Sequence, residues 1–145
     1  MNLLENEITD VTFIGSLIPQ KEPFVMVDTL YLFSEKKIVS GLTVTAKNIF
    51  TKENFFCEPG LIENMAQTIA LHTGYKYFLE QKPAPTGYIG AIKKAEIFRL
   101  PKVSEVLKTS VEILHDIMGV TLIQARIECN GEVIAQSEMK TALAQ

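Results

Sequence analysis

Cysteine, histidine and net positive charge are all scarce in this sequence of 145 residues. Its two cysteines, Cys57 and Cys129, match no metal-site spacing and no disulfide scaffold, so we expect a reducing, cytoplasmic environment. The 14 Lys and Arg against 17 Asp and Glu give a net charge of −3, which offers no general reason to bind nucleic acid. Motifs for a metal, a nucleotide or a flavin are also missing, so the expected chemistry needs no cofactor.

Repeats, low-complexity tracts and linkers are absent as well. The first residues include Glu5, Glu7 and Asp10 and contain no basic stretch followed by an apolar one, so we do not expect a signal peptide. With 47% hydrophobic residues, the chain is long enough to bury most of a core of its own. We therefore expect one globular domain over residues 1–145.

The most informative stretch that is present begins with Pro59-Gly60 and continues as an almost entirely apolar run to Tyr75. Apolar residues lie on most sides of this run, which predicts a helix buried inside the domain. Lys76 and Glu80 end the run, and at ~1.5 Å per residue it is too short to span a membrane.

One carboxylate, Glu63, lies in the predicted first turn of this helix. At ~100° per residue, Gln67, Ala70 and Gly74 share its face, and Ala66 is not far off. The three small residues, at positions 66, 70 and 74, form a stripe that would admit another surface or a slim ligand.

Glu63 has two open interpretations. The helix N-terminus favours the carboxylate by roughly 0.3–1 kcal/mol, and Glu63 would then be a cap that accepts free backbone N–H groups. Burial in an apolar tunnel favours the protonated form instead, and Glu63 could then act as a general acid.

Alternation of apolar and polar residues predicts strands around the helix. Two of these segments precede the helix, at 24–33 and 37–45, and four follow it, at 88–100, 106–115, 121–129 and 133–143. Asn130-Gly131 is a favoured two-residue hairpin turn, and Met118-Gly119 can do a similar job. The pattern predicts an α+β domain in which one long helix is inserted after the second strand of an antiparallel sheet of about six strands.

Three blocks of the sequence, in this order and spacing, resemble a known family. Residues 17–28, with Pro23-Phe24 near the centre, are similar to a Leu-Pro-His-x-x-Pro-Phe-Leu-Leu-Val-Asp block. Residues 63–67, Glu-Asn-Met-Ala-Gln, are similar to a Glu-Ala-Met-Ala-Gln helix start, and residues 131–135 echo a final hairpin. The family is the hotdog-fold 3-hydroxyacyl-acyl-carrier-protein dehydratases of fatty-acid and polyene synthesis. Within it, the chain looks closest to the short dehydratase-like proteins of aryl-polyene and flexirubin pigment clusters.

The resemblance implies a homodimer or higher oligomer that joins two sheets edge to edge and places an acyl tunnel at the interface. The substrate would be a 3-hydroxyacyl thioester of acyl carrier protein or CoA. In the family, a His of one subunit removes the α-proton, the helix acid of the other handles the departing hydroxyl, and a Gln orients groups. Glu63 and Gln67 match the last two roles.

The histidine does not match the family pattern. The Gly-His-Phe-Pro-Gly segment has no counterpart within 48–58, and Gln20 stands where the first block has His. Of the two histidines, His72 lies about 180° around the helix from Glu63 and ~13 Å along it, so these two cannot meet in one protomer. A neighbouring chain or a partner dehydratase would have to supply the base, and His115 is the other histidine available in this sequence.

Further site residues are expected near the helix start. Cys57 could be a stabilised thiolate next to the substrate, although packing is the commoner role of cysteine. Gly60 could offer a backbone N–H to the thioester carbonyl. Ala66 and Ala70 would border the acyl chain.

Four basic residues fall within ten positions: Lys93, Lys94, Arg99 and Lys102. They could hold the pantetheine phosphate or the acidic surface of a carrier protein. The alternative is a solvated strand edge, because lysines also prevent edge-to-edge aggregation.

Three functions therefore stay open. The chain could be a dehydratase with Glu63 as the acid, or a hotdog thioesterase in which Glu63 and Gln67 direct a water onto the thioester. It could also be a non-catalytic acyl-binding subunit that pairs with a complete dehydratase, since the usual histidine is missing.

Overall fold

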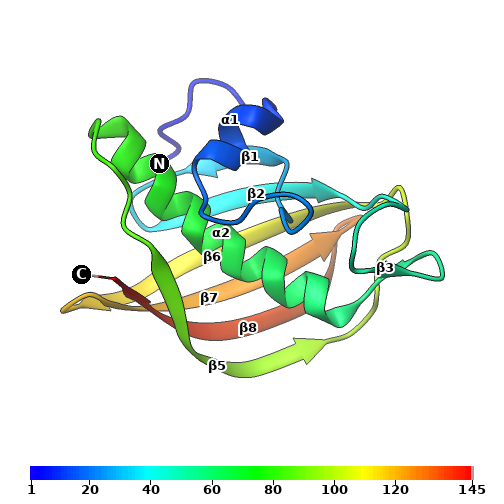
Figure 1. The fold of residues 1–145 in the computed structure, drawn as a ribbon. Coiled ribbons are helices and arrows are strands. Elements are labelled where there is room, and N and C mark those ends of the chain that lie inside the picture. Colours follow the sequence, from blue (N-terminus) through cyan, green and yellow to red (C-terminus); the bar gives the residue numbers. More distant parts are fainter. Residues whose placement is uncertain (145) are drawn as a thin grey trace.

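The fold is a curved antiparallel sheet with one long helix across its inner face (Figure 1). The computed structural model describes residues 1–144; residue 145, part of the expected domain, lies outside the described residues. The helix is α2 (Glu58–Leu79), and the strands are β1 (Thr29–Phe33), β2 (Lys37–Thr43), β5 (Gly87–Ile97), β6 (Val106–Ile117), β7 (Val120–Cys129) and β8 (Glu132–Leu143). They are ordered β1-β2-β6-β7-β8-β5 with antiparallel neighbours throughout, which confirms the predicted architecture.

The two predicted hairpin turns are confirmed. Met118 and Gly119 join β6 to β7 with φ values of 54° and 79°, and Asn130 and Gly131 join β7 to β8 with the same pair of values. Positive φ at both central residues is the turn geometry whose twist matches that of the flanking strands. Short turns of this kind fix the register of the three long strands.

Some predicted boundaries are wrong, and three short elements were not predicted: α1 (Val11–Ser16), β3 (Thr51–Lys52) and β4 (Phe55–Phe56). Asp10 caps α1 by accepting from the N–H groups of Thr12 and Phe13. The strand predicted at 24–33 begins only at Thr29, because its first half leaves the sheet and bonds to α2. Apolar composition alone does not distinguish these two environments.

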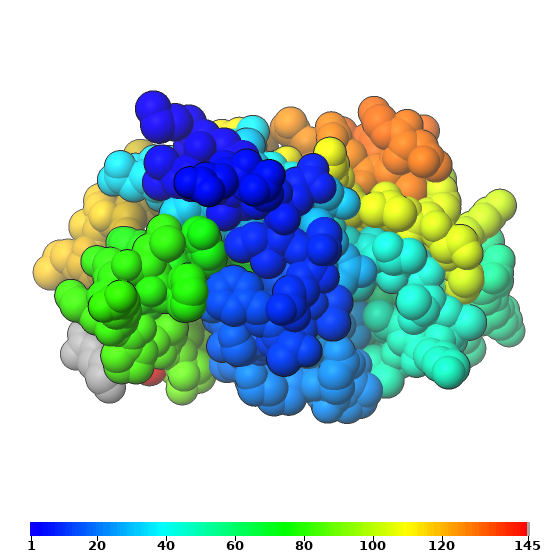
Figure 2. Space-filling model, turned by 90° about the horizontal axis from the view of Figure 1, so that it is seen from above, coloured from blue at the N-terminus to red at the C-terminus, as the bar shows by residue number. Residues whose placement is uncertain are grey.

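Residues 17–28, called the roof segment below, lie along α2 in the opposite direction to the helix. Leu17 packs on Gly74, where an added Cβ would collide with the Leu17 carbonyl, and Phe24 and Met26 bond to Gln67 one to two turns earlier. Figure 2 shows the N-terminal residues, in blue, across the middle of this face. The roof segment thus covers the side of α2 that the sheet leaves open.

One edge of the sheet is covered by another segment of the chain, and the other edge is not. The outer edge of β1 is covered by the N-terminal residues, since Ile8 and Leu30 exchange two backbone hydrogen bonds of 2.9 Å. The outer edge of β5 has no strand partner within residues 1–144. An uncovered edge offers unpaired N–H and C=O groups to another chain. None of the helices in the described part of the chain is long and apolar enough to cross a membrane.

Candidate active site

Glu63 is the sixth residue of α2 and lies in the second turn, because the helix begins at Glu58. The expected placement in the first turn is therefore wrong; Pro59 is accommodated in the first turn, where a missing N–H costs no hydrogen bond. Glu63 is half-buried, and among the described residues its hydrogen-bond partner is the side chain of Gln67. No backbone N–H within residues 1–144 donates to it, so the interpretation of Glu63 as a helix cap is wrong.

Gln67 holds Glu63 in a fixed orientation. Its Nε2 donates to Glu63 Oε1 at 2.9 Å and to the Phe24 carbonyl at 2.7 Å, while its Oε1 accepts from the Met26 N–H at 2.6 Å. A backbone N–H can bond only to the amide oxygen, and a backbone carbonyl only to the amide nitrogen. The side-chain amide of Gln67 therefore has to be oriented with Oε1 toward Met26 and Nε2 toward Phe24. An N–H donor is therefore directed at the carboxyl group of Glu63.

Asn64, next to Glu63 on α2, is a fully buried polar residue that was not among the predicted site residues. Its Nδ2 donates to the Met26 carbonyl at 2.8 Å, and its Oδ1 accepts from Thr109 Oγ1 at 2.6 Å. Asn64 and Gln67 together hold three backbone groups of the roof segment. Two signals pointed to this contact: an amide within an apolar helix, and a threonine on the inward face of the strand predicted at 106–115.

Ala66 and Ala70 border a cavity of about 60 Å³ between α2, β5 and the start of the roof segment. Ile89 contributes from β5 and Gln20 from the roof segment, and Gln20 Oε1 is buried with no hydrogen-bond partner among the described atoms. Gly74 does not line this cavity but packs against the roof segment. The predicted stripe of small residues therefore divides between a cavity and a close packing contact.

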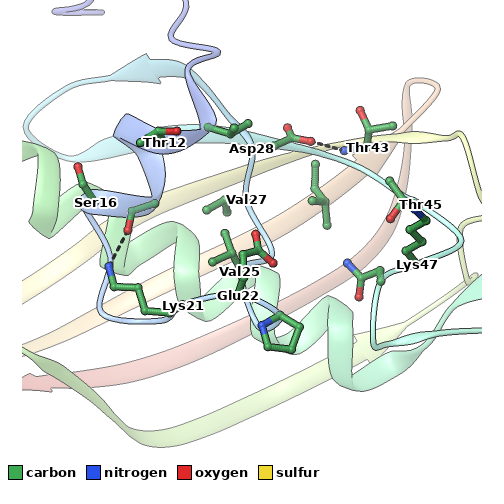
Figure 3. A pocket seen from close by; sticks show the side chains of 15 residues that line it. Thr12, Ser16, Lys21, Glu22, Val25, Val27, Asp28, Thr43, Thr45 and Lys47 are labelled. Carbon is green, nitrogen blue, oxygen red and sulfur yellow. Dashed lines mark hydrogen bonds between the residues drawn. The ribbon is translucent and has the colours of Figure 1, made fainter.

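A larger groove, of about 660 Å³, lies on the outer side of the roof segment between α1 and the end of β2 (Figure 3). Two of its charged side chains are already engaged. Lys21 donates to two backbone carbonyls at 3.0 and 3.1 Å, and Asp28 accepts from the Thr43 N–H at 2.9 Å. Neither Glu63 nor Gln67 lines the groove, so it is separate from the candidate site.

Both histidines lie away from Glu63. His72 is buried on the other side of α2, with Nε2 2.8 Å from the Ser34 carbonyl and its ring centroid 4.8 Å from that of Phe33. His115 is exposed and lies ~30 Å along β6 from the end of that strand near which α2 begins. The expected separation of His72 from Glu63 is confirmed.

Comparisons with known proteins agree with this geometry. The family model described as "ApeP-like: ApeP dehydratase" matches residues 12–145. The chain belongs to the ApeP-like dehydratase family. It is 31% identical to the 3-hydroxyacyl-[acyl-carrier-protein] dehydratase FabZ of Aliivibrio fischeri over 95% of both chains. It is 30% identical to the FabZ of Clostridium botulinum, covering 90% of this chain and 92% of that protein.

A solved structure shares the fold. The dehydratase heterocomplex ApeI:P from Xenorhabdus doucetiae contains a chain that superposes with a TM-score of 0.84 at 17% identity, covering 91% of each chain. This ApeP-like protein therefore has the hotdog fold, as the sequence predicts. Its dehydratase-like character follows from the family model and from the FabZ relatives.

Two further predicted site residues of this ApeP-like protein lie at the start of α2. Cys57 is the N-cap residue and is half-buried, with Sγ 3.7 Å from the Phe55 carbonyl. Gly60 is buried against the Phe56 ring, and its N–H donates to the Cys57 carbonyl at 2.9 Å. A thioester carbonyl would have to displace that bond, so the donor role of Gly60 stays a prediction.

Arg99 is bound to carboxylates of its own chain. It donates to Glu132 at 3.1 Å and to Glu105 at 3.2 Å, and these bonds, Glu132 first, raise the pKa of its guanidinium. Glu105 in turn accepts from the Lys102 N–H at 2.7 Å, which lowers the pKa of that carboxyl group. A substrate phosphate would have to compete with these carboxylates for Arg99.

The three lysines of the basic cluster are exposed. Lys93 and Lys94 lie on β5, where Lys94 Nζ is 3.5 Å from Glu138, an ion pair of small energetic value because its lysine is 75% exposed. Lys102 lies in the connection between β5 and β6. Their proposed contact with a phosphate or a carrier protein stays a prediction.

His72 makes the stability of the fold depend on pH. Burial, followed by nearby Lys76 and Lys36, lowers its pKa below the usual 6.5, although the Ser34 carbonyl opposes the shift. The unfolded chain therefore binds a proton that the folded chain does not, and the free energy of unfolding falls as the pH drops below about 6.5. We expect urea unfolding at pH 7.5, 6.5 and 5.5 to show a slope of at most about 1.4 kcal/mol per pH unit from this group.

The matched control for this prediction is the exposed histidine. His72→Gln should flatten the slope between pH 6.5 and 5.5, because glutamine can still donate to Ser34 but does not titrate. His115→Gln makes the same chemical change at an exposed position of the same chain. Equal slopes for the wild type and His72→Gln would mean that another group titrates in this range.

Proposed function

We propose that this chain is the acid-bearing subunit of a 3-hydroxyacyl thioester dehydratase and that a partner dehydratase supplies the histidine base. The substrate class is suggested by the relatives that are 3-hydroxyacyl-[acyl-carrier-protein] dehydratases. The observation that carries the proposal is the hydrogen bond from Gln67 Nε2 to Glu63 Oε1, in a segment that matches the helix start of the dehydratases.

The reaction is a β-elimination of water. A base removes the α-proton of the thioester, the C–O bond to the 3-hydroxyl breaks, and Glu63 donates a proton to the departing oxygen. The products are a 2-enoyl thioester and water, and the protonated base then returns its proton to Glu63. Atoms and electrons balance with no cofactor.

The need for a partner follows from the positions of the histidines. The ring of His72 is hydrogen-bonded to the Ser34 carbonyl of its own protomer. His115 lies at the opposite end of β6 from the start of α2. Histidine is the side chain best suited to act as a base at physiological pH, so the base would come from another chain. The similarity to a chain of a dehydratase heterocomplex supports a hetero-partner over a second copy of this chain.

The outer edge of β5 is the surface that we assign to this partner. It is the uncovered edge of the sheet. Tyr88 and Ile92 on β5 are 61% and 45% exposed, and Phe98, directly after the strand, is 58% exposed. A strand of another hotdog subunit could continue the sheet here and cover these side chains. Such pairing would also close the cavity that Ala66 and Ala70 border, since β5 forms one of its walls.

Ala66 and Ala70 would border the acyl chain, which would arrive as a thioester of acyl carrier protein or CoA. The exposed Lys93, Lys94 and Lys102 would meet the acidic carrier or the phosphate. The resemblance of its sequence to proteins of pigment clusters supports polyene intermediates as the substrates and the cytoplasm as the location.

The test is reconstitution. We expect this chain, purified alone, to give no enoyl product from 3-hydroxyacyl thioesters of several chain lengths, as measured by mass spectrometry. Adding a dehydratase encoded in its gene neighbourhood should produce enoyl thioester at an enzyme-like rate. Replacing the histidine of that partner's active site should remove the activity again.

Other outcomes separate the alternatives. Turnover by this chain alone would show that no partner histidine is needed. Release of free thiol without enoyl product would favour a thioesterase in which Glu63 and Gln67 direct a water. A complex that binds acyl thioesters, and whose turnover depends only on partner residues, would favour a non-catalytic acyl-binding subunit.

A further inference from the structure

We propose that Asn64 is a positioning residue for Glu63 and acts through Met26 and Gln67, an inference that rests on the proposed role of Glu63 as the acid. Asn64 stands where the helix start that this sequence resembles has Ala. It connects β6, across α2 and the roof segment, to the carboxyl group of the site.

The connection is a directional series of hydrogen bonds. Thr109 Oγ1 donates to Asn64 Oδ1 at 2.6 Å, and Asn64 Nδ2 donates to the Met26 carbonyl at 2.8 Å. The Met26 N–H donates to Gln67 Oε1 at 2.6 Å, and Gln67 Nε2 donates to Glu63 Oε1 at 2.9 Å. Each donor meets an acceptor, so the series has one direction, from the sheet to the carboxyl group.

The side-chain amides of Asn64 and Gln67 can each take only one of their two orientations. The Met26 carbonyl can only accept, which requires the nitrogen of Asn64 to face it, and the oxygen of Asn64 then faces Thr109. The Met26 N–H can only donate, which requires the oxygen of Gln67 to face it. Asn64, Gln67 and Thr109 are all fully buried, so water does not compete for these bonds.

The hydrogen bond from Gln67 distinguishes the two carboxyl oxygens of Glu63. A neutral carboxyl group has one oxygen that only accepts and one that carries hydrogen. When Glu63 serves as the acid, the N–H that Gln67 directs at Oε1 favours Oε1 as the accepting oxygen and Oε2 as the oxygen that carries the proton. Asn64 stabilises this arrangement by fixing Met26, on which the amide sense of Gln67 depends.

The test compares two buried hydroxyl groups of similar surroundings. Thr109→Val removes the donor to the Asn64 side chain, and Thr109→Ser restores it. Thr68→Val is the matched control: Thr68 is also fully buried and donates to the Asn64 backbone carbonyl at 2.7 Å, but it is not in the series. Steady-state rates are measured with the reconstituted complex.

We expect Thr109→Val to lower kcat about tenfold with little change in KM, because a misdirected acid affects the chemical step and not binding. Asn64→Ala should have a larger effect, Thr109→Ser should recover most of the rate, and Thr68→Val should keep it. In a chain that already carries Glu63→Gln, Asn64→Ala should have no further effect on kcat, because residues that act through one group are not additive.

A second readout needs no substrate. In ¹⁵N NMR spectra, the Gln67 side-chain amide hydrogens should exchange slowly in the wild type and in Thr68→Val, and faster in Asn64→Ala. Equal losses of kcat for Thr109→Val and Thr68→Val, or additivity with Glu63→Gln, would reduce Asn64 to a packing residue and overturn the proposal. A Glu63→Gln variant with the wild-type rate would instead overturn the proposed function, and the positioning role with it.

Discussion

Glu63→Gln is expected to lower kcat of the reconstituted dehydratase by about 10²–10⁴-fold, the range that a positioned acid or base contributes. Glutamine has the size of glutamate and its oxygen can still accept from Gln67 Nε2, so the contact of 2.9 Å survives. What it cannot do is donate an acidic proton to the departing hydroxyl. KM should change little, because the substrate loses no contact in the ground state.

Glu58→Gln is the matched control for this variant. Glu58 is an exposed glutamate of the same helix, in the first turn, and the same chemical change there should leave kcat unchanged. Circular dichroism of both variants should equal that of the wild type. The unfolding midpoint of Glu58→Gln should fall slightly, because a carboxylate in the first turn of a helix stabilises it by roughly 0.3–1 kcal/mol. A Glu63→Gln complex with full activity would remove Glu63 from the mechanism.

The helix and its pair of polar residues could be predicted from the sequence because they depend on local periodicity. Four residues separate Glu63 from Gln67, and this spacing places both on one helix face and produces their hydrogen bond. The same periodicity places Ala66 and Ala70 beside a cavity and His72 on the opposite side. The hairpin turns follow equally from two-residue turn chemistry.

The contacts of the roof segment could not be predicted, because they join residues 38 to 43 positions apart: Met26 with Asn64, Met26 with Gln67, and Phe24 with Gln67. The residues at 24–28 are apolar enough for a strand. They leave the sheet because the buried side-chain amides of Asn64 and Gln67 need hydrogen-bond partners. Glu132, one of the two carboxylate partners of Arg99, was missed for the same reason, since it approaches from β8, 33 positions away.

These contacts show how the site depends on α2 for more than its carboxyl group. Buried polar side chains need partners, and here the partners of Asn64 and Gln67 are backbone groups of the roof segment. The roof segment is thereby held over the same helix face that presents Glu63. Any change that lifts the roof segment from α2 should therefore affect stability and catalysis together.

Gly74→Ala is expected to be the strongest such change and to lower the free energy of unfolding by about 3 kcal/mol, at the upper end of the cost of overpacking. Alanine inside a helix normally stabilises by about 1 kcal/mol relative to glycine, so the expected sign is the reverse of the usual one. The reason is that a Cβ at Gly74 would overlap the Leu17 backbone carbonyl, which cannot move as a side chain can.

Gly15→Ala supplies the control, because Gly15 is a helical glycine of α1 and an added Cβ there meets nothing within 4 Å. It should be neutral or slightly stabilising. Urea unfolding at one fixed protein concentration measures both variants, since association with a partner would otherwise shift the midpoint. Because Leu17 begins the roof segment, Gly74→Ala should also lower kcat of the reconstituted complex, while Gly15→Ala should not. A stable and fully active Gly74→Ala variant would show that the roof segment does not need its close contact with α2.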